Sequence, residues 1–349
     1  MLRLEAGVNE DGRRLDRFLK KYLPGAPLAF VYRTLRKDVR VNGLRAPQET
    51  LLKEGDVIEI FLTEDQLAEF AGRPRTLHKA KRQFGIVYED EKVLFVNKPF
   101  GLLTHGDEHE KKNTLANQVA GYLMEQGVWR PEPGNTFSPA PANRLDRNTT
   151  GLVAFGKILP ALRDLTAMMR GKADAGEAVE AGEAVEAPIE KYYLTIVRGR
   201  LEAPLTLTGR IVRDRQRNVS RVLPVGIIEE DGFAGQAQRA EMEARPLRQG
   251  NGYTLVEAKL ITGRTHQIRA QLAAAGYPLV GDQKYGDARA NADTERAFGL
   301  TTQLLHAYRL AIRAGAGSLD YLTGKEFVCE PPERFQLISE ELGCSMKMK

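Results

Sequence analysis

The sequence predicts an α+β protein, in which a small N-terminal unit of two helices and a hairpin is followed by a larger domain built on a mixed, mainly antiparallel sheet. Three observations support this prediction. Apolar residues recur at helical spacing in two short segments before residue 37. From residue 39 onward, short alternating or apolar segments are separated by turn residues, which is typical of strands joined by hairpin-like turns. The length of 349 residues suits two or three domains.

Composition indicates a folded protein with no membrane partner. The hydrophobic fraction is 42%, and no apolar run approaches the ~20 residues that cross a bilayer. The N-terminus lacks the basic-then-apolar pattern of a signal peptide, so we expect a cytoplasmic protein. Cys329 and Cys344 are too few for a disulfide framework or a four-thiolate zinc site, and both are expected to be reduced.

The first expected unit spans residues 12–63. Apolar residues from Leu15 to Tyr22 follow the spacing of an amphipathic helix, and a second helix is expected over 28–36. The alternating segment that closes in Asn42-Gly43 predicts a hairpin turn, and a last strand follows it. The basic residues expected on the outer faces of the two helices are Arg14, Arg17, Lys20, Arg33, Arg36 and Lys37.

A linker is expected at residues 64–82, which are polar and show no sustained apolar period. The second domain is expected over 83–340. It opens with the short apolar strand 93–96, and Thr114 is expected to cap a helix that ends near Met124.

An acidic insertion is expected at residues 174–190. It contains six acids and neither Lys nor Arg, and the hexad Ala-Gly-Glu-Ala-Val-Glu occurs twice within it. Such a segment has too little apolar surface to pack, so we expect a flexible loop. Without these six acids, the net charge of the chain would be six units more positive than the overall +5. This excess favours a phosphate-rich partner.

Further along, residues 190–199 and 253–261 each read as strands, and a helix is expected to continue from the segment 262–269 through Ala275. Between the two strands lie Arg213, Arg215 and Arg217, which would share one face of an extended chain and could follow a track of phosphates. A solvated, charged hairpin explains the same three residues equally well.

The polar turn Asn143–Leu152 places Asp146 between Arg144 and Arg147, directly before an apolar run. This carboxylate is either a structural ion-pair hub or a reactive acid, and residue types alone favour the hub because most Asp residues near Arg are only paired. No metal site is predicted, since the residue after His105 is Gly106, where a helical His-Glu-x-x-His site needs its Glu. Gly151–Lys157 has the spacing of a phosphate-binding loop but lacks the Ser or Thr that should follow, so it is rejected.

The first unit resembles the small RNA-binding domain first known from a small-subunit ribosomal protein. The likeness rests on Arg14-Leu15-Asp16-x-Phe18-Leu19, Val39-x-Val41-Asn42-Gly43 and Leu52-x-x-Gly55-Asp56-x-Ile58-x-Ile60. It departs from many members at Pro27-Leu28-Ala29, where they have Ser-Arg-Ser. The resemblance implies that the six basic residues of this unit contact RNA. A basic interaction module without nucleic acid is the alternative.

Five blocks in the second domain occur in the order seen in the ribosomal large-subunit pseudouridine synthases. They are Asn97-Lys98-Pro99-x-Gly101-Leu102, Arg144-Leu145-Asp146-x-x-Thr149-x-Gly151-Leu152, Lys191-x-Tyr193-x-x-x-Val197-x-Gly199, Gly263-Arg264-Thr265-His266-Gln267-Ile268-Arg269 and Gly281-Asp282-x-x-Tyr285-Gly286. This resemblance implies an isomerase that converts uridine to pseudouridine, with large-subunit ribosomal RNA as its partner. It also implies that no cofactor and no metal are needed.

The same resemblance assigns roles to individual residues. Asp146 would be the catalytic carboxylate, acting either as nucleophile or as base at the sugar. Arg269 would pair with it, because a cation favours the charged form of a carboxylate in a desolvated site. Tyr193 would stack on the uracil. Arg144 would take the place of the nucleotide that is flipped out of its stack, with Asn143 and Arg147 as further RNA contacts.

Other expectations are of lesser weight. Asn143 stands where many members have His, which could mark a different substrate. His266 and Gln267 are expected to be structural, supporting the turn before Arg269, and the protein is expected to be a monomer. A catalytically silent RNA-binding or ribosome-assembly factor is the main alternative. A carboxylate glycosidase is a weaker one, because no second carboxylate has a clear place near Asp146.

Overall fold

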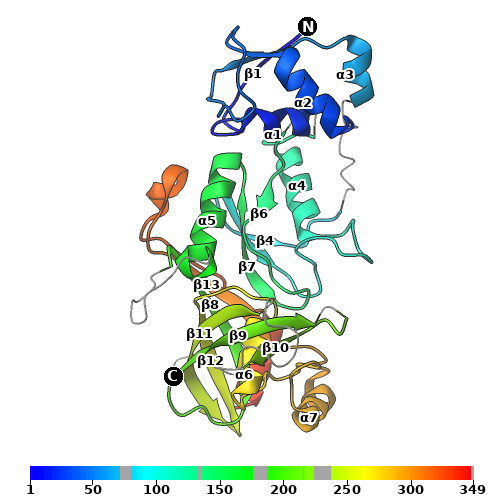
Figure 1. Ribbon diagram of the computed structural model, residues 1–349. Helices are drawn as coiled ribbons and strands as arrows, with labels where there is room; N and C mark the ends of the chain where they lie inside the picture. The colour runs from blue at the N-terminus through cyan, green and yellow to red at the C-terminus, as the bar shows by residue number, and fades with distance from the viewer. Residues whose placement is uncertain (71–79, 132–135, 176–186, 215, 224–236, 347–349) are drawn as a thin grey trace.

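The computed structural model describes residues 1–349 except 71–79, 132–135, 176–186, 215, 224–236 and 347–349. Within these residues the chain forms a small N-terminal unit beside a larger α+β domain (Figure 1). The predicted fold class is thereby confirmed, because the large sheet is mostly antiparallel. The helices of the described part are too short or too polar to cross a bilayer.

The N-terminal unit packs two helices on a three-stranded sheet. Its elements are β1 (Leu2–Glu5), α1 (Leu15–Tyr22), α2 (Leu28–Lys37), β2 (Val39–Val41), β3 (Val57–Ile60) and α3 (Glu64–Phe70). The sheet order is β1-β3-β2, with all pairs antiparallel. The apolar faces predicted for α1 and α2 form its core, in which Leu15 and Leu19 are fully buried.

The boundaries of this unit differ from the sequence expectation. Strand β1 pairs with β3, so the unit begins well before residue 12. The first part of the expected linker is helix α3, and its Phe70 ring lies 4.5 Å from the Phe30 ring. The Asn42-Gly43 turn is tight, with both residues at positive φ and an antiparallel bridge between Val41 and Leu44 across it, but the longer pairing of β2 is with the distant β3. A hydrophobic contact and a long-range pairing, neither visible in local pattern, account for these differences.

The large domain is organised on one eleven-stranded sheet among the described residues. Its strands are β4 (Gly85–Glu89), β5 (Val93–Lys98), β6 (Ala140–Pro141), β7 (Thr150–Gly156), β8 (Ile189–Arg198), β9 (Leu205–Asp214), β10 (Val219–Leu223), β11 (Gln238–Gly250), β12 (Tyr253–Leu260), β13 (Leu305–Ile312) and β14 (Glu326–Val328). The order is β10-β9-β11-β12-β8-β13-β7-β5-β4, with β14 on β13 and β6 on β7. Only the β13–β7 pair is parallel. This pair joins the two halves of the sheet next to the turn that carries Asp146.

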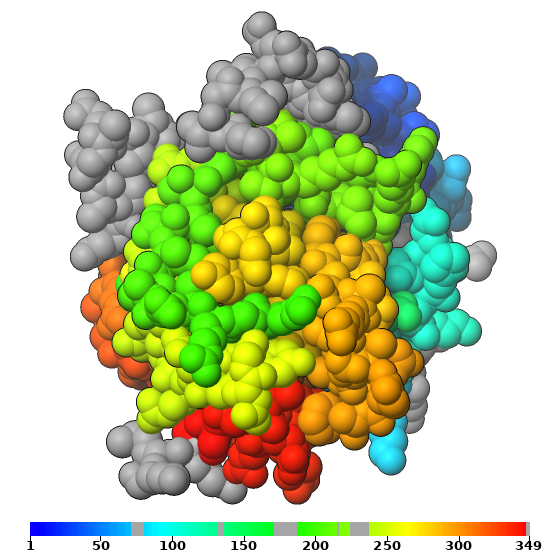
Figure 2. Space-filling model, turned by 90° about the horizontal axis from the view of Figure 1, so that it is seen from below, coloured from blue at the N-terminus to red at the C-terminus, as the bar shows by residue number. Residues whose placement is uncertain are grey.

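Helices pack on this sheet and shape its central region. They are α4 (Leu115–Glu125), α5 (Leu159–Ala175), α6 (Gln267–Ala274), α7 (Ala288–Phe298), α8 (Glu333–Glu341) and the 3₁₀ helix η2 (Gly317–Leu322). Thr114 caps α4 as predicted, accepting a hydrogen bond from the backbone N–H of Asn117. Figure 2 shows α7 (orange) beside the C-terminal segment (red), where Arg334 donates to the carbonyls of Phe298 and Gly299.

Both ends of the expected acidic insertion belong to regular elements. Its first residues belong to the end of α5, and Ile189 and Glu190 begin β8. Glu190 belongs to β8, as the strand expected over 190–199 implied, and its carboxylate pairs with Lys259 and Arg313. The part of the expected insertion over 176–186 lies outside the described residues.

The two units are joined by polar contacts as well as by the chain. Asn9 accepts a hydrogen bond from the backbone N–H of Leu159, the first residue of α5. Arg13 is buried and donates to the side chain and carbonyl of Thr136. These contacts connect the N-terminal unit to the large domain beside α5.

Candidate active site

Asp146 lies in the tight turn between β6 and β7. The turn is closed by a hydrogen bond from Thr149 N–H to the Asp146 carbonyl, 3.0 Å long. Its other side is fixed by Thr104, whose hydroxyl donates to the Leu145 carbonyl and accepts from the Leu145 N–H. The carboxylate itself keeps 27% of its side-chain surface exposed. A rigid backbone therefore presents an accessible carboxylate.

Lys98, at the end of β5, holds the same turn through hydrogen bonds to backbone carbonyls. Its fully buried ammonium group donates to the carbonyls of Leu102 and Arg147, at 2.8 and 2.9 Å. Burial lowers the pKa of Lys98 to about 7, although the charge of Asp146 acts in the opposite direction. Lys98 thus ties the loop after β5 to the residue that follows Asp146.

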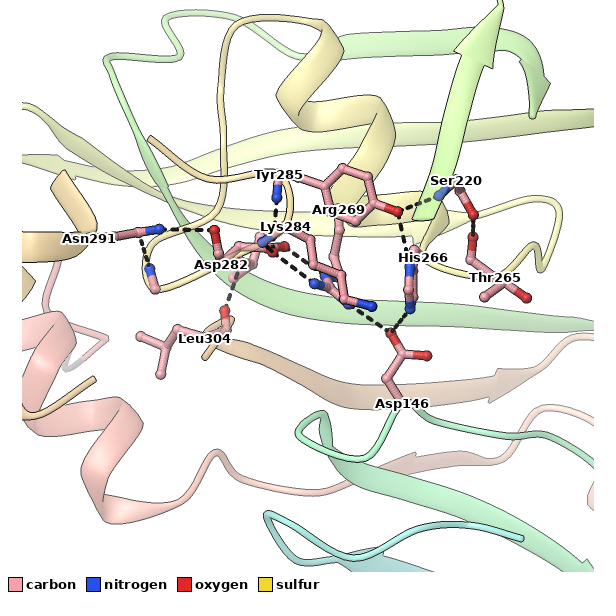
Figure 3. Close-up of polar contacts among 12 residues, drawn as sticks. Asp146, Ser220, Thr265, His266, Arg269, Asp282, Lys284, Tyr285, Asn291 and Leu304 are labelled. Carbon is pink, nitrogen blue, oxygen red and sulfur yellow. Dashed lines mark hydrogen bonds and ion pairs between the residues drawn. The ribbon is translucent and has the colours of Figure 1, made fainter. Parts of the chain in front are cut away.

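Arg269 faces Asp146 from the first turn of α6, 123 residues along the chain (Figure 3). The contact from Nη1 to Asp146 Oδ2 is 3.4 Å long. Its stronger partner is Asp282, which accepts from Nε at 2.6 Å and from Nη2 at 2.7 Å. The predicted pairing of Arg269 with Asp146 exists, but the two-pronged geometry expected of Arg is directed to Asp282.

Asp282, which holds this arginine, is itself fully buried. It is 0% exposed, and it also accepts from the backbone N–H groups of Lys284 and Tyr285. A buried carboxyl group that accepts this many hydrogen bonds keeps the guanidinium fixed. Asp282 therefore determines the direction in which Arg269 presents its remaining N–H groups.

His266 and Tyr285 complete the wall opposite Asp146. His266 Nε2 lies 3.7 Å from Asp146 Oδ2, and His266 Nδ1 lies 2.9 Å from the Tyr285 hydroxyl. The same hydroxyl accepts from the backbone N–H of Ser220 on β10, at 2.5 Å. Figure 3 shows the chain of contacts from Ser220 to Asp146. His266 is aimed at the carboxylate, which the sequence expectation of a purely structural role did not include.

Tyr193, on β8, lies in the same pocket as Asp146. The pocket is lined by residues of the Asp146 turn, of β8 and of the loop that leads into α6, including Thr149, Tyr193, Arg264, His266 and Arg269. Burial, and then the charge of Asp146, raise the pKa of Tyr193 above its ordinary value. Its hydroxyl therefore stays protonated at neutral pH.

A larger groove continues from this pocket. Its lining includes the basic residues Arg144, Arg147, Arg213 and Lys284. Arg144 and Arg213 are exposed, and Arg147 pairs with Asp107 at 3.3 Å while remaining about half exposed. The groove thus presents positive charge next to the pocket.

The other residues predicted to bind RNA fall into three groups. Asn143 uses its amide within the fold, donating to the Leu152 carbonyl and accepting from the Ala154 N–H of β7. Arg217 lies in the turn between β9 and β10, so it does not share an extended face with Arg213, and Arg215 lies outside the described residues. On the N-terminal unit, Arg14 pairs with Asp16, whereas Arg17, Lys20, Arg33, Arg36 and Lys37 are exposed.

Sequence reasoning missed the parts played by Asp282, Lys98, His266 and Tyr285. Each was visible as a member of a block, since Asp282 and Tyr285 belong to Gly281–Gly286 and Lys98 to Asn97–Leu102. The blocks did not indicate which residue faces which. The contacts among them require the loop after α6 to fold back on the first turn of that helix.

The chain was compared with known proteins. The family described as RNA pseudouridylate synthase matches residues 92–274. The ribosomal large subunit pseudouridine synthase C of Vibrio cholerae is 32% identical over 307 residues, covering 86% of this chain and 85% of the relative. That of Escherichia coli is 30% identical over 307 residues, covering 87% and 86%. Among solved structures, human RNA pseudouridylate synthase domain containing 4 superposes with a TM-score of 0.55 at 21% identity, covering 74% of this chain and 93% of the other.

Proposed function

Since the chain belongs to the RNA pseudouridylate synthase family, we propose that it converts uridine to pseudouridine in large-subunit ribosomal RNA, with Asp146 as the reactive carboxylate. The names of its relatives from Vibrio cholerae and Escherichia coli specify the large ribosomal subunit. One observation carries the residue assignment. Asp146, Tyr193 and Arg269, which are far apart in the sequence, line a single pocket.

The reaction determines what this pocket must supply. The bond between N1 of uracil and C1′ of ribose breaks, and a bond between C5 and C1′ forms. C5 loses a proton and N1 gains one, so the product is an isomer and no electrons are transferred. The chemistry therefore requires a charged carboxylate at the nucleoside and a means of turning the ring, and it requires no redox group.

Asp146 is suited to this role in either of two ways. As a nucleophile it would attack the nucleoside, and as a base it would remove a proton from the sugar. Arg269 supplies a fixed positive charge 3.4 Å from Oδ2 of this carboxylate. Tyr193 would stack on the uracil ring and place its protonated hydroxyl near C5.

RNA would reach the pocket through the open groove beside it. Arg144, Arg147 and Arg213 line this groove and could contact phosphates of the strand around the target uridine. Arg144 also lines the inner pocket, so its side chain is placed to fill the space of an extruded nucleotide. The exposed basic residues of the N-terminal unit would bind RNA farther from the target.

The test is to map pseudouridines in ribosomal RNA from cells that lack the gene. At least one position in the large-subunit RNA should become uridine, and the wild-type gene should restore it. Asp146→Asn should not restore it, whereas Asp293→Asn should, because Asp293 is exposed and pairs with Arg296 three residues along its own helix. If no position is lost, or if Asp146→Asn restores it fully, the proposed function is wrong. The second result would instead favour an RNA-binding role without catalysis.

A further inference from the structure

His266 has a backbone conformation that is uncommon for residues other than glycine. Its φ is 56° and its ψ is 21°, in the left-handed region. The other non-glycine residues with positive φ in the described chain are all Asn, which tolerates that region well. A His is retained there only if the surroundings fix it, and such positions concentrate at functional sites.

The hydrogen bonds around His266 fix where its proton lies. The backbone N–H of Ser220 can only donate, so the Tyr285 oxygen accepts from it. The Ser220 hydroxyl also contacts this oxygen while donating to the Thr265 carbonyl, so the Tyr285 hydroxyl can direct its own proton to His266 Nδ1, 2.9 Å away. Nδ1 is thus an acceptor, and the ring proton is on Nε2, which faces Asp146.

The charges around the ring agree with a neutral imidazole. Burial lowers the pKa of His266 to about 4. Asp146 and Asp282 oppose this shift, while Arg269 and Lys284 add to it. At neutral pH the ring therefore carries one proton and acts as a donor without carrying a charge.

The arginine and the histidine that face Asp146 both approach the same carboxylate oxygen. Arg269 Nη1 and His266 Nε2 approach Oδ2, at 3.4 and 3.7 Å (Figure 3). No hydrogen bond to Oδ1 is recorded within the described part of the chain. A carboxylate that is held on one side presents its other oxygen to the pocket.

We propose that His266 is a positioning residue of the reaction, whose Nε2–H donates to Oδ2 of Asp146 in the complex with RNA and so turns Oδ1 toward the nucleoside. Tyr285 is the second positioning residue, because it fixes the imidazole tautomer. This inference rests on the proposed function of Asp146. The 3.7 Å separation exceeds a hydrogen bond, but contacts of this kind at active sites often tighten only when substrate is bound.

The arrangement also links the reaction to the β9–β10 hairpin. Ser220, on β10, holds Tyr285 through its N–H and donates through its hydroxyl to the Thr265 carbonyl beside His266. Arg213, on β9, is directly opposite Ser220 in the hairpin register and lines the basic groove. The strand pair that contacts the groove is therefore the one that sets the orientation of His266.

Two substitutions separate the role of the donor from that of the fold. His266→Asn keeps an amide near the Nδ1 position and suits the left-handed backbone, but it removes the N–H that faces Asp146. His266→Gln places an amide N–H near the Nε2 position. The assay is single-turnover release of tritium from C5 of uridine in transcribed large-subunit ribosomal RNA, with RNA affinity measured on the same transcript.

His266→Asn should slow the reaction about 10-fold or more, the effect of losing one hydrogen bond to a charged group, with RNA affinity unchanged within about 2-fold. His266→Gln should recover most of the rate. Equal loss in both variants, or wild-type rate in His266→Asn, would overturn the inference. Tritium release by Asp146→Asn at the wild-type rate would instead overturn the proposed function.

A spectroscopic measurement tests the tautomer without changing His266. In nitrogen-15 spectra of protein labelled in histidine, His266 should be the Nε2–H tautomer in the wild type. Tyr285→Phe removes the hydroxyl and should populate the Nδ1–H form while lowering the single-turnover rate. An Nδ1–H tautomer in the wild type would contradict the proposal.

Discussion

Asp146 and Asp282 contact the same arginine, and replacing each by Asn should separate a structural carboxylate from a reactive one. Asp282 is fully buried and makes two short hydrogen bonds to Arg269, at 2.6 and 2.7 Å. Removing one partner of such a buried pair costs about 3–5 kcal/mol, because it leaves a buried charge uncompensated. For a chain of this size the thermal midpoint should fall by on the order of 10 °C.

Asp146→Asn should behave differently. Its contacts, at 3.4 and 3.7 Å, are long, and its carboxylate is partly exposed. The loss should stay within about 1 kcal/mol, which corresponds to a few degrees in thermal midpoint. Catalysis should nevertheless be abolished, because the reactive oxygen is replaced.

The measurement is thermal unfolding of both variants beside the wild type, with Asp293→Asn as the control for loss of an exposed carboxylate. The expected order of midpoints is wild type, Asp293→Asn and Asp146→Asn close together, and Asp282→Asn far below. If Asp146→Asn lost as much stability as Asp282→Asn, Asp146 would be an ion-pair hub. The assignment of Asp146 as the reactive group would then lose its physical basis.

Three further predictions use other parts of the molecule. Arg269→Lys should lower the single-turnover rate at least about 10-fold, since one ammonium cannot serve both Asp282 and Asp146; a rate near that of wild type would refute this role. His306 is buried between Thr150 and the Cys329 carbonyl, and burial lowers its pKa to about 4. The unfolded chain therefore binds more protons than the folded chain between pH 6.5 and 4. The free energy of unfolding should fall by roughly 3 kcal/mol as the pH drops through this window. His306→Gln should flatten the dependence of the thermal midpoint on pH, and an unchanged pH dependence would contradict the assignment. Arg213→Ala should reduce the slope of log affinity for RNA against log salt by about 1 and leave the thermal midpoint unchanged, whereas an unchanged salt slope would show that Arg213 does not contact phosphate.

Local pattern was sufficient for elements with strong periodicity or clear end signals. The helical spacing between Leu15 and Tyr22, the cap at Thr114 and the apolar run of β7 each correspond to an element of the structure. Strand β11 gave a weak signal, because its buried positions include the small residues Ala240 and Ala244 between charged ones. Short or weakly alternating strands acquire their structure from pairing with distant partners, which local pattern does not contain.

The site shows the same limit in a sharper form. The ordered blocks of sequence indicated that Asp146 and Arg269 belong together, and the structure places them 3.4 Å apart. The blocks did not indicate that Asp282 takes the two-pronged side of the guanidinium. That fact depends on how the chain after α6 returns to the helix. A pairing between two carboxylates and one arginine is a three-body arrangement, which cannot be read from any one block.

This arrangement changes the meaning of the ion pair at Asp146. Arg269 is already paired with and oriented by Asp282, so it needs no second carboxylate for stability. Its Nη1 can therefore face Asp146 from a position that does not have to reorganise during the reaction. The same position filled by a lysine could be held by Asp282 or directed at Asp146, but the single ammonium could not be fixed for both. In the proposed reaction Asp282 would contribute stability and Asp146 reactivity, and the guanidinium fork would allow one cation to serve the two functions.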